Sequence, residues 1–199
     1  AWLGGALYGH GKSTIVAWDG PVDGHMWWSH AVAYFRYNGI HWDGQGKAGI
    51  GMYHQSDTVY ETHIIHENER WSGFTQAAVT TALDLPDYLA MSPLATSEIH
   101  FRNLIIEDSP VGVLINFFNA YDNAFDGVIF RNTAIGIYSR AGINYIRNTR
   151  FENSSDCDIV LGVFSAFTTI HRAVSVGSHK FVCSTNNPNL LPLSWSHVA

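Results

Sequence analysis

Four consecutive segments in the second half of the chain share a pattern that repeats about every 22 residues. Each segment has a short apolar alternation, a small polar corner and a second apolar run. The segments are EIHFRNLIIEDSPVGVLI (98–115), NAFDGVIFRNTAIGIY (123–138), INYIRNTRFENSSDCDIVL (143–161) and FTTIHRAVSVGSHKFV (167–182). Their aligned corners are Asp108, Asn132, Asn153 and Ser178. A repeat of this length is typical of solenoids, in which stacked coils bury one continuous core.

The apolar runs within each repeat indicate strands and not helices. They are three to five residues long, rich in β-branched and aromatic side chains, and bounded by Asn, Asp, Gly and Ser. No stretch shows the 3.6-residue periodicity of a helical repeat, and the Leu-x-x-Leu-x-Leu pattern of leucine-rich repeats is absent from the sequence. The pattern therefore predicts an all-β fold, a parallel β-solenoid whose coils hydrogen-bond to those above and below.

The polar corner has a physical cause. Asn and Asp tolerate left-handed backbone conformations and hydrogen-bond to nearby backbone groups, so they suit a sharp bend. When such residues stack once per coil, their side chains also hydrogen-bond along the axis. We therefore predict that Asn132 and Asn153 form a structural ladder and do not belong to a binding site.

The whole chain, residues 1–199, is expected to form one β-helix domain. Its predicted parts are irregular early coils over 8–79, an inserted loop or short helix over 80–97, regular coils over 98–182 and an irregular tail over 183–199. The insertion is predicted because two prolines and leucine-rich spacing interrupt the repeat there. Neither end supplies an obvious cap for the exposed coil edge, so we expect a fragment of a longer protein, or an oligomer.

Composition limits the partners. The formal net charge is -6, and the lysines are only Lys12, Lys47 and Lys180. This balance argues against nucleic acid, which needs a clustered basic face. No apolar run approaches the ~20 residues of a membrane span. The two cysteines, Cys157 and Cys183, leave both their pairing and the redox compartment open.

One segment near the start imitates a nucleotide-binding motif. ALYGHGKST (6–14) fits a loose phosphate-binding loop, with Gly11, Lys12 and Ser13 at the critical positions. A true phosphate-binding loop opens a helix whose N-terminus helps to hold the phosphates. Here the β-branched run TIVAW follows and ends at a turn, so we expect a glycine turn that enters a coil, and no nucleotide.

Three stretches resemble a known superfamily. GHGKSTIVAWDGP, RYNGIHWDGQGKAGIGMYH and NFFNAYDNAFDGVIFRNTAIGIYSRAGINYIRNTRFENSSDCDI are similar to the pectate-lyase-like right-handed parallel β-helix superfamily, and the likeness covers residues 8–182. It is greatest to a bacterial branch with a Gly-x-Gly-Lys-Ser-Thr opening and a Trp-Asp-Gly-x-Gly-Lys-Ala-Gly turn. The resemblance implies a right-handed, single-stranded parallel β-helix. It also implies a secreted or cell-envelope protein that acts on a polysaccharide or binds a glycan. The catalytic signatures of polygalacturonases and of calcium-dependent pectate lyases are not matched.

The first candidate site lies in HQSDTVYETHIIHENE (54–69), which concentrates acidic and histidine side chains in a charge-poor chain. We expect a long exposed loop or coil edge, either solvated and without function or catalytic through His54, Asp57 and Glu61. The HIIHE segment matches neither zinc helix pattern, and in a strand His63 and His66 point to opposite faces. We therefore predict no metal site.

The second candidate site combines NFFNAYDN (116–123) with SRAG (139–142), which follow the corner in successive coils and should lie above one another. Sugars bind to planar apolar faces flanked by polar groups, and this face has both. Alternatively, the phenylalanines pack inside and the polar residues form a turn. The predicted substrate-binding residues are Asn116, Asn119, Tyr121, Tyr138 and Arg140, and Asp122 is a fourth catalytic candidate.

The chemistry stays open between three alternatives. Glycoside hydrolysis needs two carboxyl groups about 5–9.5 Å apart, for which Glu61, Asp57 and Asp122 are the candidates. A lyase acting on a uronate needs a base and positive charge, which Arg140 or His54 would supply together with Ca²⁺. We slightly favour a hydrolase without a cofactor, because the chain is acidic. The third alternative is a non-catalytic surface or spike β-helix that binds glycans or scaffolds other domains.

Overall fold

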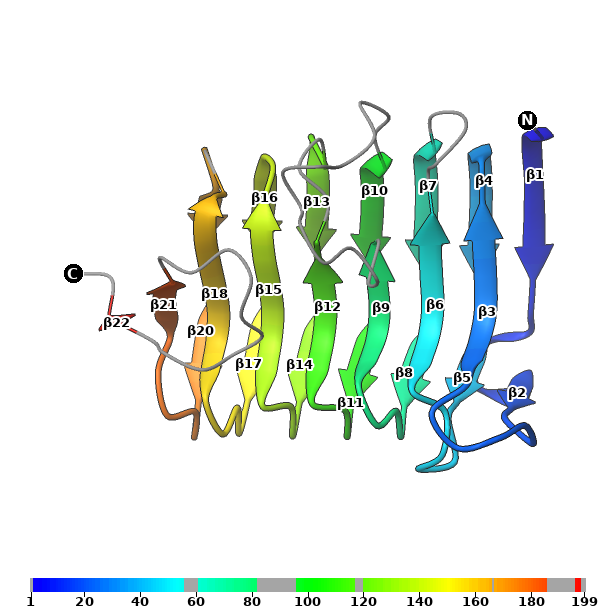
Figure 1. The fold of residues 1–199 in the computed structure, drawn as a ribbon, viewed down its shortest axis with the longest axis horizontal. Helices are drawn as coiled ribbons and strands as arrows, with labels where there is room; N and C mark the ends of the chain where they lie inside the picture. Colours follow the sequence, from blue (N-terminus) through cyan, green and yellow to red (C-terminus); the bar gives the residue numbers. More distant parts are fainter. Residues whose placement is uncertain are drawn as a thin grey trace.

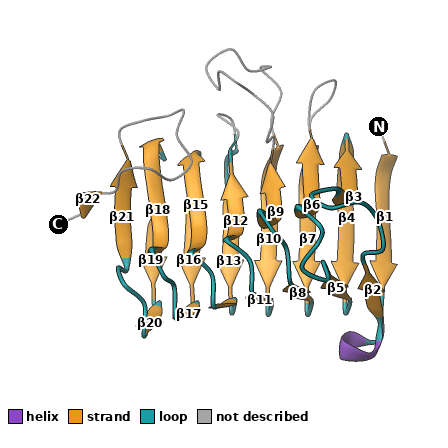
Figure 2. Cartoon of the chain, turned by 60° about the horizontal axis from the view of Figure 1, so that its bottom comes forward, coloured by secondary structure: helices purple, strands orange, loops and turns teal. Residues whose placement is uncertain are grey.

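The computed structural model describes residues 2–55, 61–81, 96–116, 120–165, 167–185 and 196–197. In these residues the chain winds as a parallel β-solenoid, and every third strand returns to the same sheet (Figure 1). Figure 2 shows η1 (Gly11–Ser13), a single 3-10 turn, beside the strands. The predicted all-β solenoid is confirmed, and no described helix is long and apolar enough to cross a membrane.

Three sheets run along the solenoid axis. Sheet A contains β1 (Trp2–Tyr8), β4 (Val32–Asn38), β7 (Glu61–Glu67), β10 (Thr96–Arg102), β13 (Asn123–Asp126), β16 (Asn144–Arg147) and β19 (Thr169–His171). Sheet B contains β2 (Ile15–Ala17), β5 (His41–Asp43), β8 (Arg70–Ser72), β11 (Ile105–Glu107), β14 (Ile129–Arg131), β17 (Arg150–Glu152) and β20 (Val174–Val176). Sheet C contains β3 (His25–His30), β6 (Ile50–Gln55), β9 (Ala77–Thr81), β12 (Val111–Ile115), β15 (Ile135–Ala141), β18 (Cys157–Phe164) and β21 (Val182–Thr185), with the antiparallel β22 (Ser196–His197) at its edge.

The inward-facing side chains form columns along the axis because neighbouring strands pair in parallel register. In sheet A, Tyr37, His66, Phe101 and Phe125 stack with successive ring centroids 4.9, 5.4 and 4.8 Å apart. Sheet B has a matching pair, Trp42 over Trp71, at 5.1 Å. Sheet B also stacks two phenyl rings farther along the axis, at the same separation. These rings are buried, so removal of their apolar area from water stabilises the stack.

The predicted corner ladder is confirmed for three coils. Asn132 donates to Asp108 at 3.0 Å, and Asn153 donates to Asn132 at 3.3 Å. All three have positive φ, between 50° and 59°. The alignment of the fourth coil was wrong by one residue, because Gly177 and not Ser178 has the left-handed conformation and packs against the Asn153 amide.

The boundaries of the coils also differ from the prediction. Strand β1 pairs with β4, so residues 2–8 already belong to the solenoid, although the early coils were predicted from residue 8. Strand β9 ends at Thr81 and β10 begins at Thr96, so the ends of the predicted insertion over 80–97 are strand. Residues 82–95 lie outside the described residues. The run after the glycine turn of ALYGHGKST forms β2, a strand as expected.

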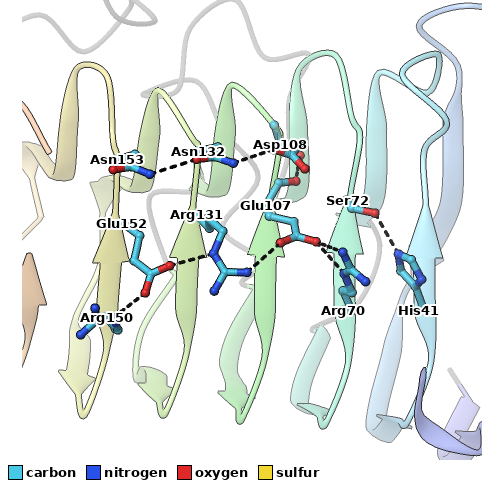
Figure 3. A network of polar contacts seen from close by, with 11 residues as sticks. His41, Arg70, Ser72, Glu107, Asp108, Arg131, Asn132, Arg150, Glu152 and Asn153 are labelled. Carbon is cyan, nitrogen blue, oxygen red and sulfur yellow. Dashed lines mark hydrogen bonds and ion pairs between the residues drawn. The ribbon is translucent and has the colours of Figure 1, made fainter. Parts of the chain in front are cut away.

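A second ladder, made of charged side chains, crosses the outer face of sheet B (Figure 3). Glu107 accepts from Arg70 Nε at 2.6 Å and forms an ion pair with Arg131 at 3.3 Å. Arg131 also donates to Glu152 at 2.7 Å, and Arg150 donates to the same carboxylate at 2.5 Å. These two guanidinium groups, Arg150 first, lower the pKa of Glu152. The charges alternate along the axis, so each coil is tied to the next.

Glu107 is the buried member of this ladder, and replacing it with glutamine should cost about 1–3 kcal/mol of unfolding free energy. The substitution leaves two guanidinium groups without their shared carboxylate. Chemical denaturation of Glu107→Gln measures the loss. The control Glu152→Gln, at a more exposed carboxylate, should cost clearly less, and equal losses would contradict the importance of burial.

Candidate functional site

The predicted catalytic residues His54 and Glu61 do come together, but inside the solenoid. His54 Nδ1 lies 2.9 Å from Glu61 Oε1, and both side chains are fully buried. Ser29 donates to the same Glu61 oxygen at 2.5 Å. Glu61 therefore cannot contact a polysaccharide on the surface, and Asp122 lies on the opposite, outer side of sheet A. Asp57 lies outside the described residues.

The buried contact continues into a longer chain, which we call the Glu–His relay and define as Glu61, His54, His66 and Glu69. His54 Nε2 lies 3.1 Å from His66 Nε2, and His66 Nδ1 lies 2.8 Å from Glu69 Oε2. Trp42 closes the relay by donating its indole N–H to Glu69 at 2.8 Å. Burial lowers the pKa of His66, and Glu69 opposes this effect.

The expectation of an exposed loop over residues 54–69 was therefore wrong for most of that stretch. Residues 61–67 form β7, in which Glu61, Ile64 and His66 are buried and His63 is exposed. Ile64 and His66 follow the two-residue alternation, and the left-handed residue His63 interrupts it, so that Glu61 is buried as well. The prediction that His63 and His66 face opposite sides is confirmed. Residues 56–60 lie outside the described residues.

The second predicted cluster is only partly a surface. Arg140 Nη1 donates to Asn116 Oδ1 at 2.5 Å, so the two segments do lie in adjacent coils. Asn116, Tyr138 and Arg140 are nevertheless buried and do not offer the open face that was predicted. Tyr121 is exposed, and Asn119 lies outside the described residues.

An open site lies on the outer face of sheet A. Two hollows of about 440 and 410 Å³ adjoin there and share His100 and Asp122. We call them together the sheet A groove. Its outward-facing lining residues, in chain order, are His63, Ile65, Glu98, His100, Arg102, Asp122, Ala124, Tyr145, Arg147, Thr169 and His171.

Strand alternation places these side chains in the groove. In β10, Ile99 and Phe101 are buried in the core, so Glu98, His100 and Arg102 point outward. The same logic applies to β16, where Ile146 is buried and the residues on either side of it face solvent. Successive coils repeat every strand about 4.8 Å farther along the axis, so the outward residues form rows.

Hydrogen bonds and stacking fix several groove side chains. Arg102 donates to His100 Nδ1 at 3.0 Å, which leaves the His100 Nε2–H as the donor. Burial, followed by the charge of Arg102, lowers the pKa of His100. His63 stacks on Tyr34 at 4.4 Å and contacts Glu98 at 2.7 Å. At neutral pH the groove therefore contains an uncharged His100 ring near the charged side chains of Arg102 and Glu98.

A column of left-handed residues borders the groove. Tyr34, His63, Glu98 and Asp122 have φ of 55° or 56°, although none is glycine. The four residues occupy the same position in consecutive coils, where the chain bends, and the parallel register stacks their side chains in a line. Bulky residues rarely adopt this conformation, so the packing of each coil must maintain it.

The groove brings together two carboxylates that sequence reasoning did not pair. Glu98 and Asp122 occupy equivalent places in adjacent coils, and the Glu98 N–H donates to the Tyr121 carbonyl at 2.8 Å. Tyr145, a residue that is 45% exposed, lies one coil farther on, with its hydroxyl 3.5 Å from Asp122. Among the described residues, no cluster of three His, Cys, Asp or Glu side chains is arranged to hold a metal ion.

Sequence reasoning missed most of the groove. Asp122 was the only groove residue among the predicted site residues, while Glu98, His100, Arg102 and Tyr145 were not. The signal was present in EIHFR and INYIR, where polar or aromatic residues alternate with core residues. It was attributed to the repeat alone. The sequence matches no protein-family model, and no curated protein is significantly similar to it.

Proposed function

We propose that the protein binds a polysaccharide chain along the sheet A groove. The observation that supports this most is the pair of adjoining hollows, open to solvent and parallel to the solenoid axis. Tyr145 offers an exposed ring for a sugar face, and His100, Arg102 and Arg147 offer donors for hydroxyl groups. A groove along a row of coils suits a polymer because each coil repeats a similar contact.

Glycoside hydrolysis is a second candidate, favoured by the two groove carboxylates. Hydrolysis with retention uses carboxyl groups about 5–5.5 Å apart, and adjacent coils are about 4.8 Å apart. In this reaction Glu98 and Asp122 would act as acid and nucleophile. Of the predicted carboxyl candidates Glu61, Asp57 and Asp122, this proposal keeps only Asp122, because Glu61 is buried in the core and Asp57 lies outside the described residues.

The protein is proposed to work outside the cytoplasm, at the cell envelope or as a secreted protein. A disulfide joins Cys157 to Cys183, and disulfides persist mainly in oxidising compartments. This supports the expectation drawn from the superfamily resemblance.

Removing the Tyr145 ring should weaken polysaccharide binding about tenfold, because a buried aromatic contact is worth about 1–2 kcal/mol. Affinity electrophoresis over a panel of neutral and acidic polysaccharides measures the retardation of the protein and of Tyr145→Ala. The control is Tyr8→Ala, at a tyrosine outside the groove that is 66% exposed against 45% for Tyr145, and this variant should bind normally. Equal loss in both variants, or no binding by the unmodified protein, would refute the groove proposal.

Hydrolysis is tested separately on the polysaccharides that bind. Release of reducing ends that disappears in Glu98→Gln and in Asp122→Asn, with binding retained, supports the hydrolase. Both substitutions keep the side-chain shape, and asparagine tolerates the positive φ at position 122. Unsaturated uronate products, detected by ultraviolet absorbance, would indicate a lyase instead. Binding without any product would leave a glycan-binding protein.

A further inference from the structure

The Glu–His relay is fully enclosed, and its proton count is constrained by geometry. It has three contacts in series, Glu61–His54 at 2.9 Å, His54–His66 at 3.1 Å and His66–Glu69 at 2.8 Å. Each is a hydrogen bond only if it contains one proton. Two ionised carboxylates and two neutral imidazoles supply only two such protons, so the chain needs one more.

Without the third proton, two nitrogen lone pairs would face each other at the His54–His66 contact. With a fourth proton, two N–H groups would point at each other, or a carboxyl group would lose its hydrogen bond to the neighbouring imidazole. Compared with the two-proton state, the three-proton state is also electrostatically better. It reduces the buried charge of the two carboxylates from two units to one, and the charge is expensive to bury.

The described side chains that pack against the relay favour the shared proton, and none of them is charged. Tyr37 and Phe101 stack on the two faces of His66, at 4.9 and 5.4 Å, where aromatic faces attract an imidazolium. Tyr37 is the other titratable group against the relay. Burial raises its pKa, so its hydroxyl stays protonated and hydrogen-bonds to Ser29. The remaining described contacts, from β5 and β8, are the indoles of Trp42 and Trp71, which do not titrate.

We propose that the Glu–His relay binds one shared proton and makes the first coils of the solenoid sensitive to pH in both directions. In sheet C, strand β3 supplies Ser29 and strand β6 supplies His54. In sheet A, strand β7 supplies both Glu61 and His66. The relay therefore joins the two sheets through the core. A change in its proton count breaks a buried contact between these sheets. The inference is independent of the sheet A groove, which lies on the outside.

The sign of the pH dependence follows from proton counts. The protons counted here are those beyond the two of the neutral imidazoles. Above the pKa of free histidine, about 6.5, the unfolded chain holds no such proton and the folded chain holds one, so stability falls as the pH rises. Between about 4.3 and 6.5 the unfolded chain holds two and the folded chain one, so stability falls as the pH drops. The relay contribution should therefore peak near pH 6.5 and change the unfolding constant about tenfold per pH unit on either side.

The test compares urea unfolding from about pH 5 to pH 8.5 in the protein and in His66→Phe/Glu69→Gln. The double variant continues the phenyl column of Phe101 and Phe125 and leaves an amide oxygen to accept from Trp42. The difference between the two profiles should peak near pH 6.5, while His179→Gln, an exposed histidine, should keep the original profile. A difference that is flat, or that changes in one direction only, would overturn the proposal.

A second measurement needs no variant. Nitrogen-15 NMR of the histidine rings at neutral pH should show protonated Nδ1 atoms on His54 and His66 and intermediate shifts at the two facing Nε2 atoms. A carboxyl-carbon shift typical of a protonated glutamate at position 61 would place the same proton one contact away and also support the relay. Two ordinary neutral rings with unprotonated Nε2 atoms beside two ionised glutamates would refute it.

Discussion

Gly136→Val is expected to unfold the protein or to cost about 3 kcal/mol or more. A Cβ atom at Gly136 would lie 2.6 Å from the Phe151 ring and 2.8 Å from the Asp158 carbonyl oxygen. The first neighbour is a buried ring stacked on Phe130, and the second is backbone of the next coil, so neither can move away at low cost. Thermal and urea unfolding measure the loss.

The same contact recurs in other coils, which makes the prediction a test of the packing rule. Phe130 lies over Gly112 as Phe151 lies over Gly136, so Gly112→Val should be similarly costly. The control is Gly46→Asn, because a Cβ at Gly46 meets nothing and asparagine accepts its positive φ. If all three variants were equally stable, the glycines would not be making room for the aromatic columns.

The repeat was sufficient to predict the fold because the same physical constraint acts in every coil. An inward apolar pair, a left-handed corner and a second apolar run can be recognised in four successive segments, and the Asp108–Asn132–Asn153 ladder follows from them. The alignment failed at Ser178 because the last coil uses glycine at the corner, which leaves no polar signature to align. Glycine and asparagine are alternative solutions to one backbone requirement.

The site was harder to predict because chemistry and position were confused. The residue types of His54 and Glu61 suggest catalysis, but both side chains point into the core, where they form part of the relay. The groove residues Glu98 and Tyr145 belong to the regular coils, where polar or aromatic residues alternate with core residues, so the sequence does not distinguish them from the repeat. Which outward rows adjoin a hollow depends on the three-dimensional stacking of coils, which a single sequence does not specify.

Replacing both Cys157 and Cys183 with serine is expected to cost about 3 kcal/mol of stability, because the disulfide closes a loop with a sequence separation of 26 residues. The two cysteines lie in β18 and β21 and are buried with Tyr138 and Val160 in a small apolar cluster on sheet C. The bond ties the last described coil to the one before it. Guanidinium unfolding under oxidising and reducing conditions measures the effect.

The loss should be local, because each coil of a solenoid contacts only its neighbours. Hydrogen exchange in the double variant should therefore speed up first in β19 (Thr169–His171), β20 and β21, while the amides of β7 and β10 remain protected. The matched control is the single variant Cys157→Ser, which also removes the disulfide but changes only one buried side chain. It should show most of the loss of protection that the double variant shows. Uniform loss of protection along all coils would show that the solenoid unfolds as one cooperative unit, and unchanged exchange at β21 would show that the disulfide does not hold the final coil.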